Sequence, residues 1–102
     1  MKPLPNDGDL LGVARNVIWF ESPEQALADP IRFLAYLMTY GTLEEVVVVM
    51  RYFSLDDFRE GLERAPPGVF DKRSWNYWNL MTGRYPAPPM PERRIPGADI
   101  PA

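Results

Sequence analysis

The chain has 102 residues, which is room for one domain, and its apolar fraction of 46% is enough to build a hydrophobic core. It contains no cysteine and no histidine, which excludes disulfides, thiolate nucleophiles, imidazole chemistry and zinc sites of the usual kind. The net charge of −3 gives no reason to expect nucleic acid or an anionic membrane as the partner.

The beginning of the chain is predicted to be a flexible arm over residues 1–16. Residues 1–9 contain two prolines, a glycine and alternating charges. The segment 10–20 is apolar enough to be ordered but shows no clear preference between helix and extended backbone. We therefore expect the folded helical domain to span residues 17–83.

Helix start and stop signals recur from residue 22 onward. Ser22 before Pro23 is typical of an N-cap followed by a first helical turn, and Asp29 before Pro30 repeats the pattern. Connections between the signals are short, so the helices must pack against their neighbours. The expected fold class is all-α, a compact bundle of four to five short helices. Beyond the start at Ser22, the predicted helices cover 30–40, 43–53, 55–65 and 72–82, with N-caps at Asp29, Thr42, Ser54 and Asp71 and stops at Gly41, Pro66–Gly68 and Gly83.

The apolar faces of these helices predict their depth in the bundle. Helix 30–40 is apolar nearly all round, so it should be central, and helix 55–65 is cleanly amphipathic and should be peripheral. Helix 43–53 contains a run of valines that would also suit a strand. We expect a helix because a capping box precedes it and Leu43, Val46, Val47 and Met50 follow the helical repeat.

Helix 72–82 carries more apolar surface than one core-facing stripe requires. Its side chains Trp75, Tyr77, Trp78, Leu80 and Met81 cover well over half of its circumference. A small bundle cannot surround one of its helices completely, so segment 10–20, the C-terminal tail or another protein must cover the surplus.

Residues 84–102 are predicted to be an extended, proline-rich C-terminal arm. Six of these nineteen residues are proline, which disfavours helix and sheet and favours polyproline II. A stiff extended segment loses little entropy when it docks, and aromatic and arginine side chains are enriched at binding hot spots. The predicted partner-binding residues are Trp75, Tyr77, Trp78, Arg84, Tyr85, Met90, Arg93 and Arg94. At least one of Trp75 and Trp78 is also expected to belong to the core.

Catalysis, cofactors and metals have little support. The acidic pairs Glu44/Glu45 and Asp56/Asp57 fall in first turns of helices, where capping and the helix dipole explain them. No glycine-rich phosphate loop or calcium-loop spacing occurs. We predict that the protein is not an enzyme and has no metal site or cofactor.

DNA binding is the alternative function. Lys72, Arg73, Asn76 and Asn79 lie along one edge of helix 72–82, where they could read bases as the second helix of a helix-turn-helix. The acidic side chains of helix 55–65 would repel phosphate. A homodimer closed by the surplus face of helix 72–82 is a third possibility.

The segment from residue 17 to 83 resembles a known family. The quoted stretches are "VIWFE" (17–21), "DPIRFLAYLMTYGTLEEVVVVMRYFSLDDFREGLERA" and "GVFDKRSWNYWNLMTGR". They are similar to small bacterial helical proteins encoded beside AbiEii-type nucleotidyltransferase toxins. The shared positions are Arg32 and Phe33, the turn Tyr40, Gly41 and Thr42, then Tyr52 and Phe53, and finally Ser74, Tyr77, Trp78, Leu80 and Gly83.

The resemblance implies an antitoxin that binds its cognate nucleotidyltransferase-like toxin directly. In that reading, Arg84, Arg93 and Arg94 would meet an acidic surface of the toxin. We expect a cytoplasmic protein without a membrane partner, because no apolar run is long enough to span a bilayer and the N-terminus does not resemble a signal peptide.

Overall fold

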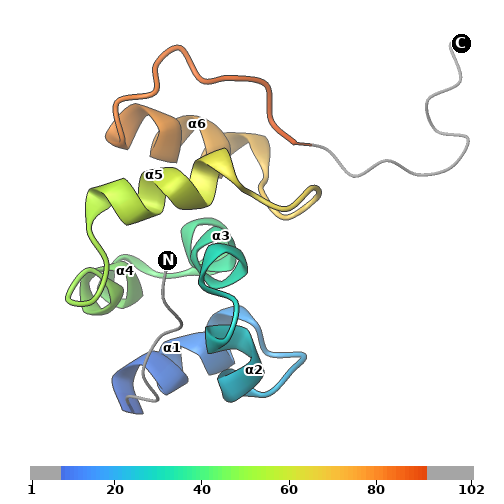
Figure 1. The fold of residues 1–102 in the computed structure, drawn as a ribbon, viewed down its shortest axis with the longest axis vertical. Coiled ribbons are helices and arrows are strands. Elements are labelled where there is room, and N and C mark those ends of the chain that lie inside the picture. The colour runs from blue at the N-terminus through green and yellow to red at the C-terminus, as the bar shows by residue number, and fades with distance from the viewer. Residues whose placement is uncertain (1–7, 92–102) are drawn as a thin grey trace, which may run out of the picture.

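The computed structural model describes residues 8–91, and none of these residues is in a β-strand (Figure 1). They form six α-helices, one more than the predicted maximum of five, so the all-α fold class is confirmed and the number of helices is corrected. The helices are α1 (Gly8–Val17), α2 (Pro23–Leu27), α3 (Pro30–Tyr40), α4 (Leu43–Val49), α5 (Leu55–Glu63) and α6 (Lys72–Met81).

Helix α1 corrects the predicted flexible arm over residues 1–16. Leu10, Val13, Ala14 and Val17 are buried, at the i, i+3, i+4 and i+7 positions of one helix face. They pack toward α2, α3 and α4. Gly12 lowers the intrinsic helix propensity, but burial of this face outweighs it. The helical domain therefore begins no later than residue 8, not at residue 17.

Helix α3 is the central element, as its nearly uniform apolar character predicts. It contacts each of the other five helices. In Figure 1 it lies between the pair α1 and α2 on one side and the pair α5 and α6 on the other. Its buried side chains are Pro30, Phe33, Leu34, Ala35, Leu37 and Met38.

Capping interactions begin α3, α4, α5 and α6 at the predicted residues. Thr42 and Glu45 form a reciprocal capping box at α4, and Ser54 and Asp57 form another at α5. The Asp29 carboxylate accepts from the backbone N–H of Arg32, and the Asp71 carboxylate accepts from that of Ser74. These side chains satisfy backbone N–H groups that the first helical turn leaves unpaired.

Helix α4 confirms helix over strand, but its length and its buried face differ from the prediction. It ends at Val49, and it buries Val46 and Val49. Leu43, Val47 and Met50, three of the four residues predicted to face the core, are exposed. The four consecutive valines of α4 point to all sides of the helix, so more than one face could be buried. In the structure Val46 and Val49 face inward as α4 packs against α1 and α3.

Helix α5 is amphipathic as predicted, with Phe58 and Leu62 buried. It approaches α3 closely at Gly61, where an added Cβ would lie 3.3 Å from the Cβ of Leu34 and from the Cε of Met38. The absence of a side chain at this position lets the two helix backbones come together.

Candidate protein-binding surfaces

Both tryptophans of α6 belong to the core, although they were predicted to be partner anchors. Trp75 is 3% exposed and Trp78 is 9% exposed. The Trp78 indole donates to the carbonyl oxygen of Met38 at 3.0 Å, and the Trp75 indole donates to that of Pro88 at 2.7 Å. The Trp78 ring joins α6 to α3 and to Phe58 of α5, whereas the Trp75 ring contacts Phe70 and the C-terminal arm. Each polar N–H finds an acceptor as its ring is buried.

The first part of the C-terminal arm covers α6. Residues 84–91 run back along α6 (Figure 1). The backbone N–H of Arg84 donates to Asn79 at 2.7 Å, and the N–H of Gly68 donates to Pro91 at 3.4 Å. Met90 is partly buried against the core. Part of the surplus surface of α6 is therefore covered by the chain itself.

The other predicted anchors have different positions. Arg84 is half-buried, with its guanidinium carbon 5.9 Å from the centre of the Trp75 ring. Tyr77 is 51% exposed and Tyr85 is 76% exposed, so both remain open to a partner. Arg93 and Arg94 lie outside the described residues.

A groove separates α4 from α6, which do not contact each other within residues 8–91. Its volume is about 190 Å³, and it is lined by Leu37, Met38, Gly41, Leu43, Val46, Tyr77 and Trp78. Exposed apolar side chains continue along both helices, at the i, i+4, i+7 positions of α4 and the i, i+3, i+4 positions of α6. We call this the α4–α6 surface, and its residues are Leu43, Val47, Met50, Tyr77, Leu80 and Met81.

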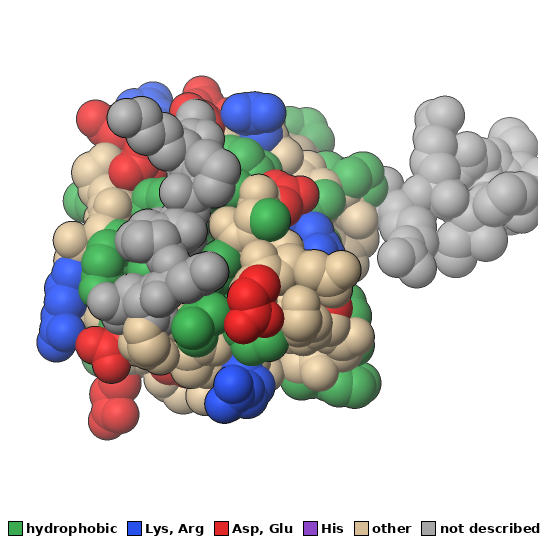
Figure 2. All heavy atoms as spheres, turned by 60° about the horizontal axis from the view of Figure 1, so that its bottom comes forward, with side chains coloured by type: hydrophobic (Ala, Val, Ile, Leu, Met, Phe, Trp, Pro, Cys, Tyr) green, Lys and Arg blue, Asp and Glu red, His purple; other side chains and the backbone are tan. Residues whose placement is uncertain are grey.

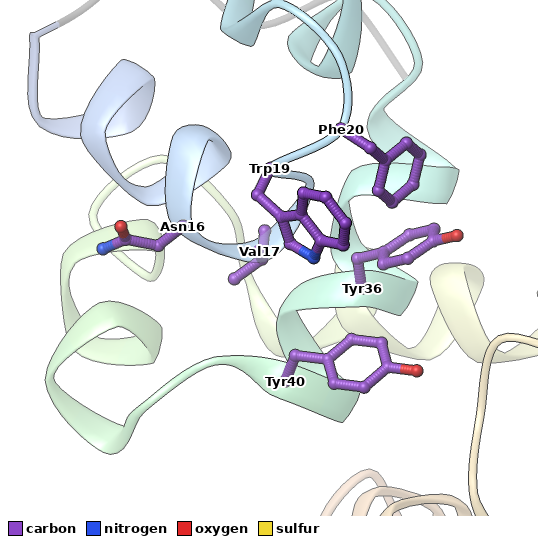
Figure 3. Close-up of a pocket in the computed structure, with 6 residues that line it drawn as sticks. All are labelled: Asn16, Val17, Trp19, Phe20, Tyr36 and Tyr40. Atoms are coloured by element: carbon purple, nitrogen blue, oxygen red, sulfur yellow. The ribbon is translucent and has the colours of Figure 1, made fainter.

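A row of four aromatic side chains forms a second surface, between the end of α1 and α3. The ring centres are 5.6 Å apart for Trp19 and Phe20, 5.7 Å for Phe20 and Tyr36, and 5.8 Å for Tyr36 and Tyr40. Together with Asn16 and Val17, these rings line an open pocket of about 460 Å³. Figure 3 shows Trp19, Tyr36 and Tyr40 beside one another, with Asn16 pointing away from them. We call this the aromatic pocket.

The aromatic pocket does not appear among the residues predicted from the sequence. The spacing of Tyr36 and Tyr40, four residues apart on an almost wholly apolar helix, is a signal that could have indicated it. The position of Trp19 and Phe20 opposite them depends on the turn after α1, which the sequence leaves ambiguous.

The charges beside the aromatic pocket are unevenly paired. Arg32 lies 5.7 Å from the Phe20 ring centre and 5.6 Å from that of Tyr36, and it binds the Glu21 carboxylate through two hydrogen bonds of 2.6 and 3.0 Å. The hydrogen bond with Glu21 raises the pKa of Arg32, although partial burial opposes this, so its charge persists at every accessible pH.

Glu45 accepts a hydrogen bond at 3.0 Å from the side-chain amide of Asn16, one of the residues that line the pocket. Within residues 8–91 it has no basic side chain at ion-pair distance. No basic side chain therefore neutralises Glu45, whose other carboxylate oxygen accepts the backbone N–H of Thr42 in the capping box of α4.

The predicted DNA-reading edge loses one of its four residues. Asn79 is completely buried, and its amide donates to the Trp75 carbonyl oxygen at 2.8 Å. Lys72, Arg73 and Asn76 are exposed. Asn79 follows Trp75 by four residues and shares its buried side of α6, which corrects its placement on the solvent edge.

Charges of both signs are mixed on the face that Figure 2 shows, with basic side chains separated by acidic and apolar ones. Among the described residues, no group of three or more acidic, histidine or cysteine side chains is placed to hold a metal ion. No helix within residues 8–91 has the length and apolar character that crossing a bilayer requires.

Comparison of the chain with protein-family models, with curated proteins and with solved structures finds no match.

Proposed function

We propose that this protein is a non-catalytic, protein-binding domain that neutralises a nucleotidyltransferase-like toxin by direct contact. The observation that supports protein binding is the α4–α6 surface, in which six apolar side chains stay between 40% and 76% exposed. The identity of the partner comes from the sequence resemblance.

The residue types of this surface are not explained by the needs of the fold. Leu43 and Val47 contribute little to the core, and an exposed valine has a lower helix propensity than the lysine, glutamate or alanine common at solvated positions. Contiguous exposed apolar side chains mark interaction sites in soluble proteins. The residue types of the α4–α6 surface therefore favour contact with a partner over contact with solvent.

The groove between α4 and α6 indicates what kind of partner element would bind there. An apolar cleft between two helices suits the apolar face of a third helix, which would enter between Leu43 and Tyr77. Arg93 and Arg94 stay in the proposal as contacts to an acidic surface of the toxin. If reversing both charges left the affinity unchanged, that part of the proposal would be withdrawn.

The test is the affinity for the nucleotidyltransferase-like protein that the proposal expects to be encoded beside this chain, measured by isothermal titration calorimetry. Val47→Glu places a charge in the α4–α6 surface. Leu55→Glu is the matched control, because Leu55 is also half-exposed but lies on α5. We expect Val47→Glu to weaken binding at least about tenfold and Leu55→Glu to leave it unchanged.

Two results would contradict the proposal. One is the absence of binding by the unaltered chain. The other is that Val47→Glu dissociates a homodimer, seen by light scattering, without changing the affinity for the toxin.

A further inference from the structure

The molecule contains two clusters with the same three components, a tryptophan, a phenylalanine set edge-on to it and an arginine stacked on a ring. In the first, Phe70 meets Trp75 at 5.3 Å with the rings 70° apart, and Arg84 lies over Trp75. In the second, which belongs to the aromatic pocket, Phe20 meets Trp19 at 5.6 Å with the rings 89° apart. Arg32 there lies over Phe20 and Tyr36.

The first cluster is occupied by a proline-rich segment of the chain itself. Residues 86–91, "PAPPMP", pass over it, and the carbonyl oxygen of Pro88 accepts the Trp75 indole N–H at 2.7 Å. Ala87 and Met90 pack against the core beside it. The structure thus contains an example of the ligand that such a cluster accommodates.

The second cluster is open. Trp19 is 78% exposed, and within residues 8–91 its indole N–H has no protein acceptor. The hydroxyl groups of Tyr36 and Tyr40 likewise have no hydrogen-bond partner in that part of the chain. Figure 3 shows the indole nitrogen of Trp19 directed toward the tyrosine side of the pocket.

These features select one kind of ligand. Flat aromatic faces and exposed N–H and O–H donors suit a ligand with apolar rings and free carbonyl acceptors. A polyproline II segment has both, because it makes no internal hydrogen bonds and its proline residues carry no N–H that needs a partner. Aromatic-lined grooves are the usual docking sites of such segments. A partner helix would offer almost no free carbonyl groups.

Charge adds a second condition. The residues that line the pocket are uncharged, and Glu21 neutralises Arg32 beside it. Glu45 accepts a hydrogen bond from Asn16, which lines the pocket, and it has no basic side chain at ion-pair distance within residues 8–91. A basic side chain next to the prolines of the ligand would therefore be complementary to Glu45, at the Asn16 side of the pocket.

We propose that the aromatic pocket binds an extended proline-rich segment with an adjacent basic residue, carried by a partner protein. The inference rests on the proposed function only in that the ligand belongs to another protein. The aromatic pocket and the α4–α6 surface share no residue, so each proposal can fail alone.

The test uses the full chain and three blocked peptides: an oligoproline ending in arginine, the same oligoproline ending in glutamate, and a glycine-serine peptide ending in arginine. Binding is followed by calorimetry and by the NMR signals of the three indole N–H groups. We expect the proline-arginine peptide to shift the Trp19 signal and leave those of Trp75 and Trp78 in place. The glutamate peptide should bind several-fold more weakly, and the glycine-serine peptide should not bind.

Variants assign the site. Trp19→Ala should weaken the affinity for the proline-arginine peptide at least about tenfold. Tyr77→Ala should leave this affinity unchanged, because Tyr77 is an exposed aromatic residue on the α4–α6 surface. Circular dichroism would show that both variants keep their helices. The Val47→Glu variant should bind the toxin more weakly and still bind the peptide, which separates the two proposals.

The proposal is overturned if the glycine-serine peptide binds equally well, if Trp19→Ala and Tyr77→Ala behave alike, or if the peptide shifts the Trp75 signal instead. It is also overturned if a chain ending at Pro91 binds the peptide much more tightly than the full chain. In that case the occupant of the pocket is this chain's own segment 92–102.

Discussion

Gly12 and Gly41 show how one residue type has opposite roles at two positions of this fold. A Cβ added at Gly41 would lie 2.6 Å from the carbonyl oxygen of Leu37 and 2.7 Å from its Cδ1. That carbonyl accepts the N–H of Gly41 at the end of α3, so it cannot move away freely. At Gly12, inside α1, no heavy atom lies within 4 Å of an added Cβ.

The two alanine variants should therefore shift stability in opposite directions. Gly12→Ala is expected to raise the free energy of unfolding by about 0.5–1 kcal/mol, because alanine is the better helix former. Gly41→Ala is expected to lower it by about 1–3 kcal/mol through overpacking against Leu37. Urea unfolding followed by circular dichroism measures both, and equal midpoints for the two variants would refute the assignment.

At the scale of elements, the capping boxes of α4 and α5 position two short helices. The hydroxyl groups of Thr42 and Ser54 accept from the N–H groups of Glu45 and Asp57, at 3.1 and 3.3 Å. Helices this short are not stable in isolation, so their boundaries depend on such contacts and on tertiary packing.

Removing either cap should destabilise the domain measurably. Thr42→Ala and Ser54→Ala are each expected to lower the free energy of unfolding by about 1 kcal/mol. Ser74→Ala is the control, because the Ser74 hydroxyl makes no hydrogen bond within residues 8–91. Thermal or urea unfolding of the three variants checks this, and a loss of stability in Ser74→Ala equal to the others would show that the caps are not responsible.

At the scale of the whole molecule, the arm residues 84–91 are part of the folded domain. They cover Trp75 and supply the acceptor for its indole N–H. The predicted boundary between domain and arm at Gly83 therefore divides a packed unit, because Met90 and Ala87 also contact the core.

Two shortened chains distinguish packed from unpacked parts of the arm. A chain ending at Gly83 should lose about 1–3 kcal/mol of stability, from the Trp75 hydrogen bond and the apolar area uncovered. It should also expose Trp75 to quenching by acrylamide. A chain ending at Pro91 should keep the stability and the protection of Trp75. If the chain ending at Gly83 were as stable as the full chain, residues 84–91 would not stabilise the packing of α6.

Helix positions followed from local signals, whereas helix faces did not. The N-caps at Asp29, Thr42, Ser54 and Asp71 were predictable because capping uses residues three positions apart. Helix α1 was missed because it has Gly12 inside it, and only burial against the rest of the molecule outweighs the low propensity. The buried face of α4 was assigned wrongly because four consecutive valines give no periodicity to read.

The candidate surfaces divide in the same way. That α6 carries more apolar surface than the bundle buries was evident from its composition, and Tyr77, Leu80 and Met81 are exposed. That Trp75 and Trp78 lie inside, and that Trp19 lies outside, depends on which elements meet.

By itself, the sequence determined the all-α class, the caps and the central position of α3, because each of these follows from residues within one or two helical turns. Only the tertiary structure decided the folding of α1, the outward side of α4, the covering of Trp75 by residues 84–91 and the assembly of the aromatic pocket. The physical reason is that a small domain can bury only part of its apolar surface. Which side chains are buried depends on which segments, distant in sequence, pack closely together in three dimensions.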